Sequence, residues 1–384
     1  MRTAYLDHAA TTPPLPEVTE AMRPYLTCRF GNPSALYSLG RESRRALEES
    51  RGKVASLIGA LPEEIIFTSG GTESANMALL GVLLAGQGNR GHIVTTAVEH
   101  YAVLETVKFI KRLGYRATVV GVDSTGMVDP DDIRKAIRAE TVLVSVMHAN
   151  NEVGTVEPLR QVTDVCREAG VYLHSDTVQT VGNIPVDVGD LGVDMLSMSG
   201  HKLYGPKGVG AIYIRRGTAV SELIHGGEQE RGMRAGTENV AGIVGLAAAA
   251  AAASEGLEVR VERISRLRDH LVEGILDSVE GVVLNGNHEA RLPNNAHLGI
   301  RRVEGEAVCL HLDAVGISAS TGSACSSEEL EPSHVLLAMG VKPVDAHGSV
   351  RFTLGRETTP EEIEYVLQEL PPIVERLRAI SPLG

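Results

Sequence analysis

A lysine occurs in an unusual setting in the stretch Met198-Ser-Gly-His-Lys-Leu-Tyr-Gly-Pro-Lys-Gly-Val-Gly210. Lys202 lies among small, loop-forming residues after a predicted strand near Met195, where a lysine can be partly buried. Burial disfavours an ammonium group and yields the free amine that forms a Schiff base with an aldehyde. A surface position is the usual fate of a lysine. The adjacent Ser199 and His201 favour the functional interpretation, because they can help to bind an anion.

A glycine turn supplies a second candidate element. The stretch Phe67-Thr-Ser-Gly-Gly-Thr-Glu-Ser-Ala-Asn76 runs from a predicted strand into a helical pattern. Backbone N–H groups near Gly71 and the Thr72 hydroxyl would then meet at a helix N-terminus, which is suited to a phosphate group. Such turns are common and often purely structural. The phosphate interpretation therefore depends on the lysine loop closing the same site.

A carboxylate follows a third predicted strand. Asp176 comes just after Val171–Leu173, at the edge where α/β sheets bind ligands. It can pair with a protonated pyridine nitrogen and keep the ring cationic, while Gln179 can bond a ring hydroxyl. An aldehyde, a phosphate and a pyridine together describe pyridoxal 5′-phosphate. The alternative for Asp176 is a helix N-cap.

Two further polar residues lie near predicted strand ends. His100, in Thr96-Ala-Val-Glu-His100, can stack on a cofactor ring and assist proton transfer. The chain has 13 histidines, so a single one is weak evidence. Asn151, in His148-Ala-Asn-Asn-Glu-Val-Gly154, is a candidate ligand contact, with a capping role as an equal alternative.

The cysteines divide into a reactive candidate and structural ones. Cys325 lies in Ser320-Thr-Gly-Ser-Ala-Cys-Ser-Ser327, a small and polar setting typical of a mobile loop that delivers a thiolate. Cys309, in Ala307-Val-Cys-Leu-His311, better fits a buried space-filling role. The chain has 4 cysteines and no C-x-x-C pair. We therefore expect no disulfide framework, no metal site and a reducing compartment.

Alternating β-rich and helical patterns between Glu64 and Arg215 predict an α/β fold with a mostly parallel sheet flanked by helices. The β-rich runs are Ile65–Phe67, His92–Thr95, Ala117–Gly121, Val142–Val146, Val171–Leu173, Met195–Ser197 and Ala211–Ile214. The candidate residues follow several of these runs, so the ends of neighbouring strands would bring them together.

The second half of the chain predicts a smaller α+β domain. From about Leu257 an amphipathic helix (Ile264, Leu267, Leu271, Ile275) precedes strand-like pieces and a last helix after Thr359-Pro360. We predict a large cofactor-binding domain over residues 15–256 and a small domain over residues 1–14 and 257–384, which carries Cys325. The alanine run Ala247–Ala253 predicts a tightly packed helix.

Composition limits the classes of partner. The net charge of −13, with 36 Lys+Arg against 49 Asp+Glu, disfavours nucleic acid. The basic stretch Arg41–Arg51 alternates with Glu42, Glu48 and Glu49, which predicts a solvated helix face. No apolar run reaches about 18 residues, so no membrane span is predicted. The first residues lack a signal-peptide pattern, and we expect a cytoplasmic protein.

Taken in order, the motifs resemble one family over nearly the whole chain: the NifS/IscS-like cysteine desulfurases of the class V aminotransferase group. The matching segments are Leu6-Asp-His-Ala-Ala-Thr-Thr-Pro13, Gly31-Asn-Pro-Ser34, the Gly-Gly-Thr-Glu-Ser turn, Asn150-Asn-Glu-Val-Gly154, the Ser-Gly-His-Lys loop, Arg231-Gly-Met-Arg-Ala-Gly-Thr237, Gly322-Ser-Ala-Cys325 and Val350-Arg-Phe-Thr-Leu-Gly355.

This resemblance implies a type I pyridoxal-phosphate transferase fold and a role for each matching residue. Lys202 would be the cofactor lysine, Asp176 the pyridine partner and His100 the stacking residue. Arg351 would clamp the substrate carboxylate, and Cys325 would receive sulfur. The remaining cofactor contacts would be Gly71, Thr72, Asn151, Gln179, Ser199 and His201, with Asn151 also near the substrate. Thr237 would reach the phosphate of a neighbouring subunit, which implies a homodimer with shared sites.

The implied activity converts L-cysteine to L-alanine and leaves a persulfide on Cys325. The sulfur would pass to an acceptor or scaffold protein for iron–sulfur clusters or thio-modifications. The alternatives are a selenocysteine lyase or class V aminotransferase that does not depend on Cys325, and a non-catalytic sulfur-relay platform. A nicotinamide dehydrogenase is not favoured, because no G-x-G-x-x-G opens a helix after the first strand of the α/β region.

Overall fold

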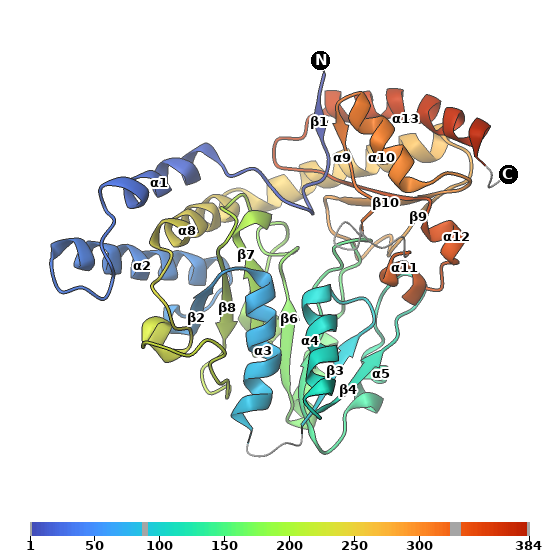
Figure 1. The fold of residues 1–384 in the computed structure, drawn as a ribbon. Coiled ribbons are helices and arrows are strands. Elements are labelled where there is room, and N and C mark those ends of the chain that lie inside the picture. The colour runs from blue at the N-terminus through green and yellow to red at the C-terminus, as the bar shows by residue number, and fades with distance from the viewer. Residues whose placement is uncertain (1, 87–90, 323–331, 382–384) are drawn as a thin grey trace.

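A seven-stranded sheet forms the centre of the larger part of the molecule (Figure 1). The computed structural model describes residues 2–86, 91–322 and 332–381. The strand order is β2-β8-β7-β6-β5-β3-β4, and only the pairs that β8 makes with β2 and β7 are antiparallel. The strands are β2 (Ile65–Thr68), β3 (His92–Thr96), β4 (Arg116–Val120), β5 (Thr141–Ser145), β6 (Tyr172–Asp176), β7 (Met195–Ser199) and β8 (Gly210–Ile214). The predicted mostly parallel sheet is confirmed.

Alternating side chains of the strands feed two separate cores, because successive residues of a strand point to opposite faces. Ile93 and Leu143 pack with α3 (Gly71–Ala85) and α4 (Tyr101–Arg112) on one face. Their neighbours Val94 and Val144 belong to the core of the other face. Helices on that second face are α2 (Ser38–Leu57), α5 (Pro130–Ala136), α6 (Leu159–Ala169), α7 (Val188–Leu191) and α8 (Val240–Ser254).

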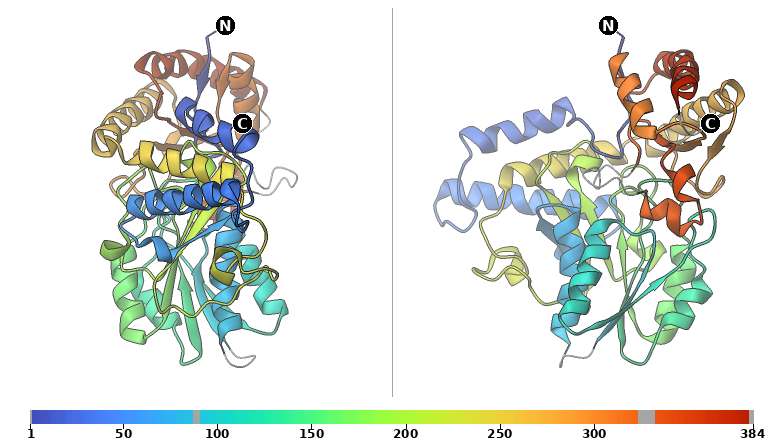
Figure 2. Two further views of the ribbon diagram at one scale, coloured as in Figure 1. Left: turned by 90° about the vertical axis from the view of Figure 1, so that its left-hand side faces the viewer. Right: turned by 45° about the vertical axis from the view of Figure 1, so that its right-hand side comes forward.

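Three helices, α1 (Pro16–Thr27), α2 and α8, pack side by side at one end of the sheet (Figure 2). The alanine run lies in α8, and its buried methyl groups allow this close approach. One expectation for α2 is wrong. Arg51 is 2% exposed rather than solvated, because its guanidinium pairs with Glu230 at 2.7 Å and donates to the Ile65 carbonyl.

The smaller part combines both ends of the chain. A three-stranded antiparallel sheet runs in the order β12 (Ser349–Thr353), β10 (Asn295–Ile300), β9 (Val282–Leu284), and β1 (Ala4–Tyr5) pairs with β11 (Ile317–Ser318). Its helices are α9 (Leu257–Ser278), α10 (Gly305–Ala314), α11 (His334–Ala338), α12 (Pro343–Ala346) and α13 (Pro360–Ile380). Thr359 and Glu362 form a capping box at the start of α13, which fixes where this last helix begins.

A distinct hydrophobic core unites Ala4 and Leu6 with side chains between Ile264 and Leu377. The domain limits of 1–14, 15–256 and 257–384 remain a prediction, which this separate core supports. Within the described part of the chain, no single helix is long and apolar enough to cross a membrane, although the bent pair α8 and α9 passes by length and composition.

Candidate active site

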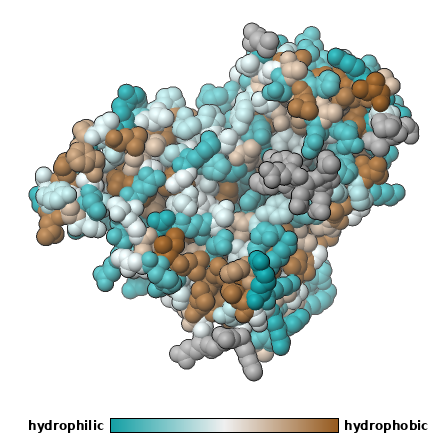
Figure 3. Space-filling view, in the orientation of Figure 1, coloured by the Kyte–Doolittle hydropathy of each residue, from teal (hydrophilic) through white to brown (hydrophobic). Residues whose placement is uncertain are grey.

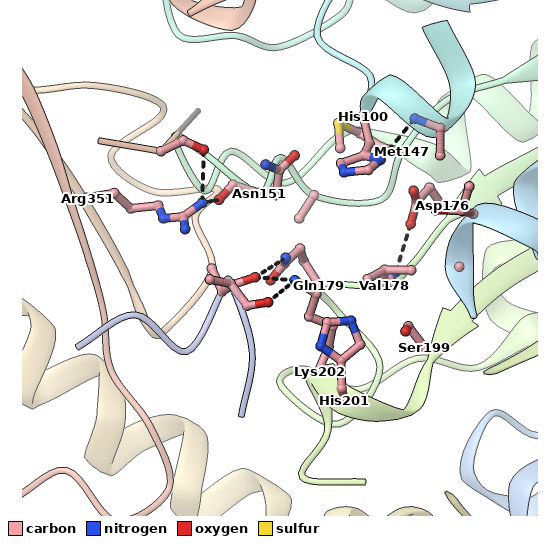
Figure 4. A pocket seen from close by; sticks show the side chains of 17 residues that line it. His100, Met147, Asn151, Asp176, Val178, Gln179, Ser199, His201, Lys202 and Arg351 are labelled. Atoms are coloured by element: carbon pink, nitrogen blue, oxygen red, sulfur yellow. Dashed lines mark hydrogen bonds between the residues drawn. The ribbon is translucent and has the colours of Figure 1, made fainter. Parts of the chain in front are cut away.

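A cavity of about 280 Å³ contains nearly all the candidate residues (Figure 4). It is lined by Gly71, Thr72, His100, Asn151, Asp176, Gln179, Ser199, His201, Lys202 and Arg351. Ala9, Ala10, Ala102, Met147, Ala149, Val178 and Gly322 complete the lining. Of the predicted site residues, Thr237 is exposed outside this cavity and Cys325 lies outside the described residues. Residues that are far apart in the sequence, several of them at the ends of neighbouring strands, therefore meet in one cavity.

The lysine loop enters the cavity from the end of β7. The strand runs into a 3-10 helix, Gly200–Lys202, and the Gly200 N–H donates to the Val209 carbonyl at 2.9 Å. The Lys202 ammonium donates to the carbonyls of Ala9 and Ala10 at 2.5 and 2.7 Å. The lysine is therefore held inside the site by backbone oxygens of a remote segment.

The glycine turn has the geometry of an anion site. Gly70 has a φ of 155°, and helix α3 begins at Gly71. A Cβ atom on Gly71 would lie 2.6 Å from Val178 Cγ2, so the turn requires glycine there. First-turn N–H groups of a helix have no intrahelical acceptor. These groups lie beside Ser199, at the end of β7, and are suited to a phosphate.

Asp176 ends β6 and is buried. Its Oδ1 accepts a hydrogen bond from the Val178 N–H at 2.9 Å, so it caps no helix. Burial raises the pKa of this carboxyl, while the nearby charges of His100 and Lys202 and the Val178 N–H act in the opposite direction. A buried carboxylate at this depth is suited to a cationic partner.

His100 is the N-cap of α4. Its Nδ1 accepts from the Ala102 N–H at 3.0 Å, so in this arrangement the proton is carried by Nε2. Figure 4 shows the ring beside Met147 at the cavity wall. This hydrogen bond fixes the orientation of the imidazole at the cavity wall.

His201 and Gln179 contact the N-terminal segment. His201 Nδ1 lies 3.1 Å from the Thr11 hydroxyl, and burial together with Lys202 and Lys207 lowers the pKa of His201 to about 4. A neutral imidazole is expected there at neutral pH. Gln179 donates its Nε2 hydrogen to the Ala9 carbonyl at 3.1 Å.

Arg351, on β12, faces the cavity from the smaller part of the molecule. Its Nη2 donates to Asp7 at 2.8 Å and its Nη1 to the Asn151 carbonyl at 2.8 Å. The Nε atom is buried without a hydrogen-bond partner in the described part of the chain. A guanidinium that lines a cavity is suited to a carboxylate ligand.

The paired asparagines have different roles. The side chain of Asn150 donates to the Val98 carbonyl and accepts from the N–H groups of Glu152 and Val153, so it shapes the turn. Asn151 lines the cavity instead. The geometry therefore favours a ligand contact over a capping role for Asn151.

Two groups of contributing residues are absent from the sequence-based prediction. One is the segment Asp7–Thr12, which lay within a recognised motif but had no assigned role. The other is Glu99, whose Oε1 accepts from the Thr96 hydroxyl at 2.9 Å and the Met147 N–H at 2.8 Å. Burial raises the pKa of Glu99 well above its usual range. This carboxyl connects the ends of β3 and β5 through hydrogen bonds, beside His100. The only sequence signal for this role is that Glu99 directly precedes His100.

The cavity meets the chemical requirements of pyridoxal 5′-phosphate. The glycine cradle at Gly71 accommodates no side chain and suits the phosphate. The buried Asp176 suits the pyridine nitrogen, and Lys202 provides the amine. The Arg351 guanidinium, which lines the cavity, suits the carboxylate of an amino acid.

The chain belongs to the aminotransferase class-V family, which it matches over residues 4–366. It is 54% identical to the cysteine desulfurase IscS of Dictyoglomus turgidum, over 99% of this chain and 97% of that protein. A solved NifS-like protein superposes with a TM-score of 0.92 at 39% identity, covering 98% of this chain and all (100%) of that one. The solved structure described as SspA in complex with cysteine has a TM-score of 0.82 at 33% identity, covering 93% of this chain and 100% of that one. The predicted resemblance to NifS/IscS-like cysteine desulfurases and the type I fold are confirmed.

Proposed function

We propose that this protein is a cysteine desulfurase that binds pyridoxal 5′-phosphate, converts L-cysteine to L-alanine and leaves the sulfur on Cys325 as a persulfide. One observation carries the proposal: a lysine, a buried carboxylate, a histidine and an arginine line a single cavity in a chain closely similar to named cysteine desulfurases. The cysteine-bound relative supports the choice of substrate.

The residues that would hold the cofactor divide by chemistry. Gly71, Thr72, Ser199 and His201 would surround the phosphate, and Asp176, Gln179 and His100 would contact the ring. Lys202 would provide the attachment. When bound, pyridoxal 5′-phosphate supplies an electron sink for charge that develops at the substrate Cα.

The protein side chains would then act on the substrate in order. Arg351 would bind the α-carboxylate through its guanidinium and so fix the position of the thiol relative to the catalytic groups. The released Lys202 amine would take up the Cα proton. His100, with its proton on Nε2, would assist proton movement at the opposite wall.

The sulfur transfer balances without an external oxidant. The Cys325 thiolate would attack the sulfur of the bound cysteine, so an S–S bond forms as the substrate Cβ–S bond breaks. The electron pair of the broken bond stays with the carbon skeleton, which takes up a proton and leaves as alanine. A later acceptor thiol would remove the sulfur.

A homodimer is part of the same proposal. Thr237 is exposed and outside its own cavity, so it is available to a second subunit. The α1–α2 region also exposes large apolar side chains that a soluble monomer would bury: Leu26, Phe30, Leu36 and Tyr37 are 67%, 70%, 83% and 61% exposed. Tan and brown atoms mark this lobe in Figure 3.

The destination of the sulfur is proposed from the relatives. Because proteins named IscS are among the most similar, we propose a protein acceptor such as an iron–sulfur scaffold. The cytoplasmic location remains a prediction. A selenocysteine lyase is retained as the second candidate, since the same cavity would accept the selenium analogue.

The test is to incubate the purified protein with L-cysteine and a reductant and to measure alanine and sulfide together. We expect equal yields that require the cofactor and are lost in Cys325→Ala. Cys28→Ala is the matched control, because Cys28 is an exposed cysteine outside the cavity. Alanine formation that persists in Cys325→Ala would instead support a lyase, and no alanine at all would support a binding platform.

A further inference from the structure

The N-terminal segment Asp7–Thr12 contacts the proposed catalytic groups of both parts of the molecule. At one end, Asp7 accepts from Arg351 Nη2 at 2.8 Å. In the middle, the Ala9 and Ala10 carbonyls accept from Lys202. At the other end, Thr12 contacts the lysine loop. The segment therefore joins the proposed substrate-carboxylate residue to the cofactor lysine.

Thr12 makes three hydrogen bonds to the loop that carries Lys202. Its N–H and its hydroxyl both donate to the His201 carbonyl, at 2.9 and 3.0 Å. Its hydroxyl oxygen also accepts from the Tyr204 N–H at 2.8 Å. His201 immediately precedes Lys202 in the sequence, and Tyr204 follows it by two residues. Thr12 is 2% exposed, so water does not replace these bonds readily.

The loop needs such support because its backbone is strained. Tyr204 has a φ of 65°, in the left-handed region that non-glycine residues rarely adopt. Hydrogen bonds hold the peptide groups on both sides of this residue. The Tyr204 N–H donates to the Thr12 hydroxyl, and the Tyr204 carbonyl accepts from the Leu15 N–H at 3.1 Å. Thr12, together with Leu15 just beyond the segment, thus fixes an unfavourable conformation of the loop that places Lys202 in the cavity.

The segment is itself fixed to the strand that bears Arg351. The Ala9 N–H donates to the Thr353 hydroxyl at 2.9 Å, and Asp7 bridges to Thr353 on β12. Thr353 is fully buried and lies two residues beyond Arg351. The distance between the carboxylate-binding arginine and the lysine is therefore set through this short segment.

We propose that Asp7–Thr12 is a positioning segment, in which Thr12 positions Lys202 and Asp7 positions Arg351. The Ala9 and Ala10 carbonyls receive the Lys202 ammonium whenever the lysine has taken up a proton and is not bonded to the cofactor. Hydrogen bonds to the charged form favour that form. This inference rests on the proposed function for the roles of Lys202 and Arg351.

The test compares Thr12→Val, which removes the hydroxyl but keeps the shape, with Thr12→Ser, which keeps the hydroxyl. We expect Thr12→Val to bind pyridoxal 5′-phosphate roughly 5- to 30-fold more weakly, by absorbance titration of the apoprotein, as the loss of one or two hydrogen bonds predicts. Its kcat should fall by a similar factor while KM for cysteine changes by less than about twofold. Thr12→Ser should restore both values.

Two further variants separate positioning from general destabilisation. Thr19→Val makes the same change at an exposed threonine outside the segment and should match the parent protein. Asp7→Asn should raise KM for cysteine severalfold, because it weakens the hold on Arg351, and leave cofactor affinity unchanged. The two ends of the segment then affect different constants, which a uniformly destabilised protein would not show.

The inference is overturned if Thr12→Val binds the cofactor and turns over like the parent, or if Thr12→Ser is impaired equally. Its failure is distinct from failure of the proposed function. A parent protein that does not bind the cofactor contradicts the proposed function, whereas a parent that binds it but forms no alanine still allows the cofactor titration of the Thr12 variants.

Discussion

Replacing Asp176 by asparagine should have opposite effects on the apoprotein and on cofactor binding. In the apoprotein, burial raises the pKa of this carboxyl, so the charged form is unfavourable there. Asparagine removes the charge and keeps an oxygen that can accept from the Val178 N–H. We expect Asp176→Asn to raise the free energy of unfolding of the apoprotein by on the order of 1–3 kcal/mol at neutral pH.

Cofactor binding should change in the other direction. Loss of the buried carboxylate removes the partner of the pyridine nitrogen, at a cost of about 2–4 kcal/mol or roughly 30- to 700-fold in affinity. Urea unfolding of the apoproteins measures the first effect, and absorbance titration with pyridoxal 5′-phosphate measures the second. The two effects together separate a functional carboxylate from a structural one.

Asp194→Asn provides a matched control. Burial also raises the pKa of Asp194, whose Oδ2 accepts from the Leu173 N–H at 2.8 Å, but this residue does not line the cavity. It should alter stability and leave cofactor affinity unchanged. An Asp176→Asn apoprotein that is less stable than the parent, or that binds the cofactor equally well, would refute the reasoning.

Three other substitutions test separate features. Burial raises the pKa of Glu157 to about 8, so the folded protein is most stable relative to the unfolded chain below about pH 4.5 and loses stability as pH rises towards 8. Near pH 7 this loss of unfolding free energy is on the order of 3 kcal/mol. Glu157→Gln should abolish this pH dependence in urea unfolding measured from about pH 5 to 8. Glu230→Ala should lower the free energy of unfolding by about 3–5 kcal/mol because Arg51 stays buried without its buried carboxylate partner and keeps only the longer contact to the exposed Glu48, whereas Glu105→Ala, at an exposed ion pair, should change it little. Arg351→Lys should raise KM for cysteine at least about tenfold with unchanged cofactor affinity, since one ammonium group cannot bond Asp7, the Asn151 carbonyl and a substrate carboxylate with the geometry of a guanidinium; an unchanged KM would exclude Arg351 as the carboxylate ligand.

Local patterns were sufficient to predict the larger part of the fold. Short β-rich runs that alternate with helical patterns identified the strands, and the shared edge of a parallel sheet explains why Asp176, His100 and Ser199 meet. The same argument, that the carboxyl ends of neighbouring parallel strands lie together, accounts for the predicted cofactor contacts that line the cavity of this chain. The Thr237 assignment came only from the family resemblance, because a residue that serves another subunit has no signal in its own chain.

Long-range pairing was not predictable in the same way. The charged residues near Arg51 in the sequence predict an exposed side chain. Arg51 is buried instead, because it pairs with Glu230, which lies 179 residues away. Similarly, no local pattern indicates that Ala9 and Ala10 accept from Lys202, because backbone carbonyls have no residue-specific signal. Side-chain periodicity reports which face is buried and cannot report which remote segment covers it.

The union of the two chain ends has a consequence for biosynthesis. Asp7 and Arg351, which are 344 residues apart, meet only after β12 has left the ribosome. The large sheet is complete at β8, so it can form while the first residues still lack their partner strand. The nascent chain is therefore expected to carry a finished cofactor cradle before it has Arg351 and the β12 contacts of Asp7 and Ala9. Catalytic competence would then be acquired only once β12 has joined the fold.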